Sequence, residues 1–182
     1  MRLNLLFLSI FLLACHDNYT PKPRGFVKID LPKKEYQQFS MDCPYTFLFP
    51  KYAKVNYLED CMIDLNFQTF SGILHITYFP LKNNLYEHIE QSRDLAYKHD
   101  TRADAISEQV FINNQQRVYG LLYDYDGLTA TAAQFYFTDS VNHFFRGALY
   151  FNTEINDSIL PVNNFLKEDI RYLIESLRWR DN

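Results

Sequence analysis

The sequence predicts an α+β domain in which a mainly antiparallel sheet of about seven strands packs against two helices. Three observations support this class. The chain of 182 residues contains 14 Tyr and 16 Phe, which favour strands. Most of it alternates between short apolar runs and turn residues, whereas two stretches carry apolar residues at helical spacing. The central strand candidates are apolar on both faces, so both faces of the sheet need cover.

The strands and helices follow in order from this periodicity and from the turn residues between them. The expected strands are 45–49, 62–67, 73–79, 108–112, 118–125, 129–138 and 143–151. A first helix begins after Asn83 or Asn84 and ends near residues 99–102, and a final helix begins at Pro161. This order resembles the α/β/α sandwich of the PsbP/Mog1 type, with the helices on opposite faces or both on one face.

Residues 1–14 have the pattern of an export signal. The apolar run from Leu5 to Ala14 is too short, at about 1.5 Å per residue, to span a hydrocarbon core of about 30 Å. Its end, Leu-Leu-Ala-Cys at 12–15, resembles the lipobox of bacterial lipoproteins. We therefore expect cleavage after residue 14 and acyl chains such as palmitate on Cys15, which anchor the protein to a membrane. A conventional signal peptide with an incidental cysteine is the alternative.

Residues 15–35 are expected to form an extended leash behind the lipidated cysteine. Pro21, Pro23 and Pro32 prevent a helix or a central strand in this basic segment. The leash would hold a single globular domain, residues 36–182, away from the lipid surface.

Cys43 and Cys61 remain once Cys15 is lipidated. An even number of cysteines in an exported chain favours a disulfide, worth about 3 kcal/mol on the chain-entropy model, and two buried free thiols are the alternative. The chain has no Cys-x-x-Cys motif and no His beside either cysteine. No metal site and no cofactor are therefore expected.

No catalytic motif stands out in the sequence. No Ser has the Gly-x-Ser-x-Gly spacing, and the five Gly are too scattered for a phosphate loop. The run from Asp124 to Gly127 lacks the distal Glu of a calcium loop and fits a hairpin turn better. An enzyme would need the fold to bring together scattered residues such as Asp64, His75 and His143.

Binding functions are constrained by charge and by the aromatic residues. The formal net charge of −4 argues against a nucleic-acid partner. Tyr119, Tyr123 and Tyr125 share one face of an expected strand. That face either binds a small ligand or peptidoglycan, or supports the internal helix, and helix support explains the pattern better.

Several ordered runs resemble the gliding motility-associated lipoprotein GldD family of Bacteroidota. They are Cys15, 21–26, 29–32, 43–45, 50–53, 82–85, 96–99, 103–106, 137–140 and the densest run, 143–151. The resemblance implies a cell-envelope lipoprotein of the gliding motility and type IX secretion machinery, a non-enzymatic accessory or assembly component whose partners are other envelope proteins. No acidic run resembling a surface-export signal follows Cys15, which favours the periplasmic side.

Overall fold

The computed structural model describes residues 29–98, 103–127, 129–153 and 159–180. The expected signal peptide, Cys15 and most of the expected leash lie outside these ranges. In chain order the elements are β1 (Tyr36–Gln38), β2 (Tyr45–Thr46), β3 (Leu48–Pro50), β4 (Lys54–Tyr57), β5 (Ile63–Phe67), the 3₁₀ turn η2 (Gln68–Phe70), β6 (Gly72–Pro80), α2 (Leu85–Tyr97), β7 (Ala105–Asn113), β8 (Val118–Asp126), β9 (Thr131–Thr138), β10 (His143–Phe151), α3 (Leu160–Ser176) and β11 (Arg178–Trp179).

A seven-stranded antiparallel sheet forms the centre of the fold, as the sequence predicts. Its strand order is β4-β5-β6-β10-β9-β8-β7. β6 and β10 pair over their whole lengths, from Gly72 opposite Phe151 to Pro80 opposite His143. The two edges differ, because β4 has four residues and β7 has nine.

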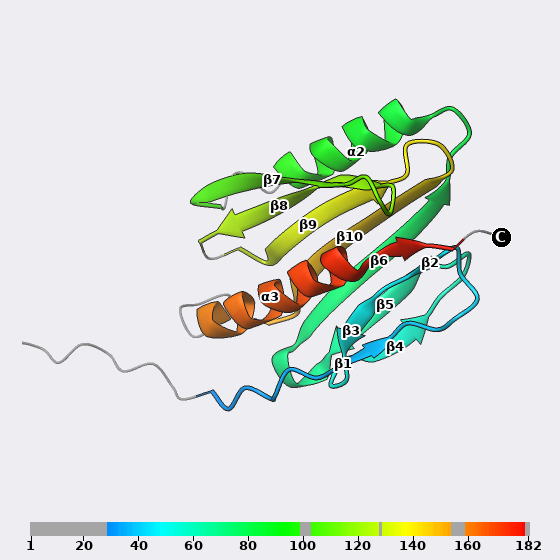
Figure 1. The fold of residues 1–182 in the computed structure, drawn as a ribbon. Helices are drawn as coiled ribbons and strands as arrows, with labels where there is room; N and C mark the ends of the chain where they lie inside the picture. The colour runs from blue at the N-terminus through cyan, green and yellow to red at the C-terminus, as the bar shows by residue number, and fades with distance from the viewer. Residues whose placement is uncertain (1–28, 99–102, 128, 154–158, 181–182) are drawn as a thin grey trace, which may run out of the picture.

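The two helices cover opposite faces of this sheet (Figure 1). Phe135 and Phe137 of β9 belong to the main core, which also contains the inward residues of α3. The intervening Tyr136 belongs to a second cluster with Ala96 of α2. Since successive side chains of a strand point to opposite faces, the alternation along β9 places one helix on each side of the sheet.

Aromatic contacts fix the position of α2. His88 stacks between Phe79 and Phe144, with ring centroids 5.0 Å apart in both pairs. At the other end of the helix, the Tyr125 hydroxyl donates to the Ala96 carbonyl over 2.9 Å. α2 ends at Tyr97, just before the expected boundary, and residues 99–102 lie outside the described ranges.

The strand expected at 45–49 is not part of the central sheet. Residue Phe47 separates β2 from β3, and each of these short strands pairs with a segment near one end of the chain. β3 pairs with β1, and β2 pairs with β11. The seventh strand of the main sheet is β4, which is mostly exposed and too short for its alternation to be recognised.

Cys43 and Cys61 form the disulfide that the even cysteine count predicts, with Cα atoms 5.6 Å apart. The bond joins the segment before β2 to the turn between β4 and β5. The Tyr45 hydroxyl donates to the Cys61 carbonyl over 2.6 Å, so this turn is also held from the core side.

Candidate functional site

Asp64, His75 and His143 do not form one site. Asp64 and His75 are opposite each other on β5 and β6, and Asp64 Oδ1 lies 2.7 Å from His75 Nδ1. His75 also stands opposite Ala148, which is five residues from His143 on β10. An odd separation along a strand places His75 and His143 on opposite faces of the sheet.

The Asp64–His75 pair lies on an open surface. The His75 side chain is about half exposed, and the nearest ring is that of Tyr150, with centroids 5.8 Å apart. Among the described residues, no Ser, Thr or Cys side chain is hydrogen-bonded to this pair. A carboxylate and an imidazole in this setting form a solvent-screened surface pair.

His143 instead borders a polar pocket of about 230 Å³ at one end of the sheet. Its Nδ1 lies 2.8 Å from the Tyr78 hydroxyl oxygen, and its ring stacks on Trp179 with centroids 4.9 Å apart. Arg117 Nη2 lies 3.5 Å from Asp139 Oδ2 in the same pocket. The pocket therefore combines a cation, a carboxylate and stacked rings.

Asp139 is engaged mainly by its own hairpin. Its Oδ1 accepts the backbone N–H groups of Val141, Asn142 and His143 over 2.7 to 3.0 Å. Burial alone would raise the pKa of Asp139, but these three donors outweigh it and hold the pKa below its ordinary value. The carboxylate is thus kept ionised to close the turn between β9 and β10.

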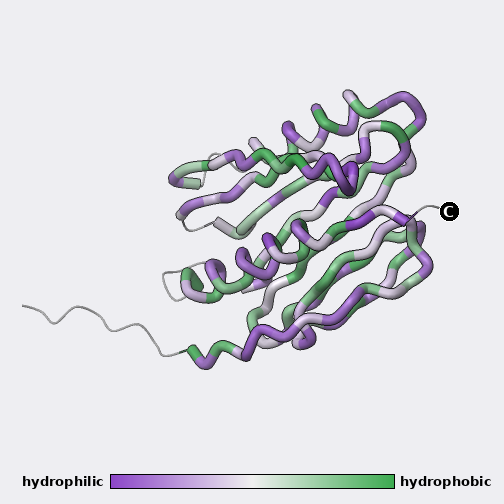
Figure 2. Tube along the Cα trace, viewed as in Figure 1, coloured by the Kyte–Doolittle hydropathy of each residue, from purple (hydrophilic) through white to green (hydrophobic). Residues whose placement is uncertain are grey.

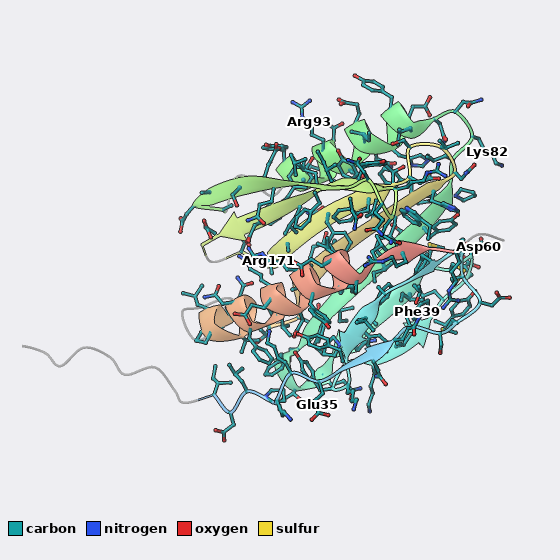
Figure 3. All side chains as sticks on the ribbon, in the orientation of Figure 1. Glu35, Phe39, Asp60, Lys82, Arg93 and Arg171 are labelled. Carbon is teal, nitrogen blue, oxygen red and sulfur yellow. A yellow bond between two sulfur atoms is a disulfide. The ribbon has the colours of Figure 1, made fainter. Side chains whose placement is uncertain are left out.

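A buried ion cluster ties α3 to the sheet. Asp124 of β8 lies 2.5 Å from Lys167 Nζ and 2.5 Å from Arg171 Nη2. Figure 3 shows Arg171 on α3 beside the strands. Lys167 also donates to the Tyr125 carbonyl over 2.7 Å. These charges neutralise one another under the helix. They line neither the polar pocket at His143 nor the groove beside β7.

A second buried carboxylate binds the start of the domain. Asp169 of α3 is only 1% exposed, and it accepts the hydroxyl groups of Tyr36, over 2.8 Å, and of Tyr52. Burial, followed by the hydrogen bond to Asp169, raises the pKa of both tyrosines, so both stay protonated donors.

Lys34, within the expected leash, joins the same cluster. Its Nζ lies 3.2 Å from Asp169 Oδ1 and donates to the Phe165 carbonyl over 2.9 Å. The last residues of the leash are therefore fixed to α3. No sequence pattern indicated this cluster, because its partners lie 117 or more positions apart and belong to no motif.

The edge strand β7 carries the most exposed apolar side chains of the sheet. Val110 and Ile112 are 70% and 69% exposed. A hydrophobic stretch is visible in β7 just before the hydrophilic hairpin that follows it (Figure 2). On the other face of β7, a groove of about 500 Å³ separates the strand from the end of α3. The groove is lined by Phe111, Ile112, Asn113, Asn114, Gln115, Val118, Phe137, Ile174, Glu175, Leu177 and Arg178.

The tyrosine-rich strand supports α2. Tyr123 and Tyr125 are buried in the cluster that contains Ala96, and the ring of Tyr97 meets Tyr123 edge-on at 6.1 Å. The helix covers Tyr123 and Tyr125, so these two side chains are not available to a ligand, whereas Tyr119 is half-buried and lies outside this cluster. The β7 groove and the polar pocket, which no sequence pattern predicted, are open in the described part of the chain.

A family model described as "Gliding motility lipoprotein GldD" matches residues 16–179. The chain belongs to the GldD family of gliding motility lipoproteins. No curated protein matches the chain. The match covers every element of the GldD-family domain from β1 to β11, and it includes Lys34 and Asp169.

Membership in this lipoprotein family implies a lipid anchor. Over the described ranges, no helix is long and apolar enough to cross a membrane. The densest resembling run, 143–151, is strand β10, which lies in the middle of the sheet. Most of its side chains therefore pack the core of this GldD-family domain, and the surface features lie elsewhere.

Proposed function

We propose that this protein is a non-enzymatic accessory or assembly component of the gliding motility and type IX secretion machinery. It is anchored through Cys15, faces the periplasm, and acts by binding another envelope protein. The observation that carries the proposal is the exposed apolar edge, Val110 and Ile112 beside the groove under β7. Exposed apolar side chains and an apolar groove at one sheet edge are typical of a site of protein interaction.

The position of the leash supports binding at that edge. Because Lys34 and Tyr36 are bonded to α3, the tether joins the domain near β1. β1 and β7 lie on opposite sides of α3 (Figure 1). From Cys15 to Lys34 an extended chain reaches about 55 Å, so the β7 edge can face partners beyond the lipid surface. The resemblance of the sandwich to the PsbP/Mog1 type stays a prediction.

Binding of a small ligand or of peptidoglycan is the second candidate function. The polar pocket with Arg117, Asp139 and His143 favours it, since a cation and a carboxylate could orient a polar molecule. Asp139 is already satisfied by three backbone donors, and the pocket is less than half the volume of the β7 groove. We therefore prefer the protein-binding function.

Cys15→Ala is expected to abolish anchoring and gliding without weakening the fold. The variant loses the acylated thiol, so it accumulates unprocessed or leaves the membrane fraction, and a deletion strain carrying it does not spread. Acyl labelling, fractionation and a colony-spreading assay measure these effects, and His16→Ala is the matched control outside the lipobox. A Cys15→Ala strain that spreads like the wild type contradicts the anchored function.

A further inference from the structure

We infer that β7 is a strand-addition site, which receives an extended segment of another envelope protein as an eighth strand of the sheet. The inference rests on the proposed function and specifies its mode of binding and the chemistry of the partner. The added segment carries apolar side chains at alternate positions toward the groove, and a basic side chain on the other face opposite Glu108.

The two edges of the sheet are built differently. Natural edge strands are protected by short length, charged side chains, proline or bulges. β4 has two of these traits, because it is only four residues long and begins at the exposed, charged Lys54. β7 is less protected: it runs for nine residues without proline, pairs with β8 without a register shift, and carries a single charged residue, Glu108.

The outer backbone of β7 is open for pairing. In the part of the chain that the structure describes, β8 is the only strand beside β7, and no turn or loop backbone group bonds to the backbone of residues 105–113. A row of N–H and C=O groups at strand spacing is matched by another extended chain, which bonds to every second residue.

The groove determines the side chains on one face of the added strand. Phe111 packs on Phe137, with ring centroids 5.8 Å apart, and Val118, Ile174 and Leu177 complete an apolar lining. Alternate residues of an eighth strand would point into this space. Its volume of about 500 Å³ accommodates several aliphatic or aromatic side chains.

The other face determines the charge of the partner. Glu108 is the only charged residue of β7, and its Oε1 accepts the Tyr97 hydroxyl over 2.7 Å. Directly opposite charges on neighbouring strands are favourable, so the added strand should place Lys or Arg there, with apolar residues beside Val110 and Ile112. A second copy of β7 has no basic residue to offer, which favours a different protein as the partner.

The functional test uses Val110→Lys and Ile112→Lys in the full chain. Both side chains are mostly exposed, so the melting curve should hardly change, but two lysines on the edge oppose strand addition. Gliding of a deletion strain should fall to the level of the deletion. Tyr86→Lys, at a 74% exposed position on α2, is the matched control and should glide normally. If the doubly substituted protein glides like the wild type, the β7 inference is wrong, while the Cys15 test of the proposed function is unaffected.

The structural test places a photoreactive amino acid at positions 108, 110 and 112 in growing cells, with position 86 as the control. Strand addition predicts adducts to residues two apart, in consecutive order, within one segment of a protein other than this chain. Adducts to β7 of a second copy, adducts scattered over many proteins, or a yield no higher than at position 86 would each overturn the inference.

Discussion

Gly147→Ala is expected to lower the free energy of unfolding by about 3 kcal/mol. Gly147 of β10 lies directly opposite Phe135 of β9, and the Phe135 ring covers it. A Cβ atom at Gly147 would lie 2.1 Å from Phe135 Cζ and within 2.7 Å of two further ring atoms. The ring is fully buried between Phe137 and Phe145, at centroid distances of 5.8 and 6.0 Å, so it has no room to move.

Urea unfolding of the purified domain measures this effect, and Gly72→Ala is the matched control. A Cβ at Gly72 would meet the end of the flexible Leu166 side chain at 3.1 Å. A terminal methyl group can shift by a few tenths of an ångström, so this change should cost less than about 1 kcal/mol. Equal stability of the two variants would show that Phe135 does not depend on Gly147.

Asp124→Asn is expected to cost about 3 kcal/mol of stability. The substitution removes the negative charge but leaves the buried Lys167 and the half-exposed Arg171 beside it. An uncompensated ammonium under α3 is more costly than the ion pair, because water cannot reach it. The loss should appear as a lower urea midpoint with an unchanged slope.

Glu168→Gln is the control for Asp124→Asn. Glu168 also bonds a lysine, with 2.8 Å between its Oε2 and Lys34 Nζ, but its side chain is two-thirds exposed. Exposed ion pairs contribute little, so this variant should unfold close to the wild type. If removing either carboxylate has the same small effect, the Asp124 cluster does not stabilise the attachment of α3.

The main elements could be predicted from the sequence because they depend on local periodicity. The hairpins, α2 and α3 all have apolar spacing and clear turn residues, and the even cysteine count indicated the Cys43–Cys61 bond. The division of 45–49 into β2 and β3 could not be predicted, since it depends on pairing with β11 and β1 near the ends of the chain. Propensity carries no information on such distant partners.

The surface features were harder to predict, because their positions depend on the order of the strands in the sheet. The strand at 108–112 was expected, but its position at the edge of the sheet follows from the strand order and has no local signature. Likewise, Asp64 and His75 meet because the register of β5 and β6 places them opposite each other. His143 lies on the other face, because it is an odd number of residues from the position on β10 that pairs with His75.

The central claim, that the protein works by binding and performs no chemistry, is tested most directly by the gliding of a deletion strain that carries Asp64→Asn with His75→Asn in the full chain. The two residues are hydrogen-bonded to each other and lie at the surface, so the fold should survive. Wild-type gliding and secretion with an unchanged melting temperature are expected. A folded, membrane-anchored double variant that neither glides nor secretes would contradict it.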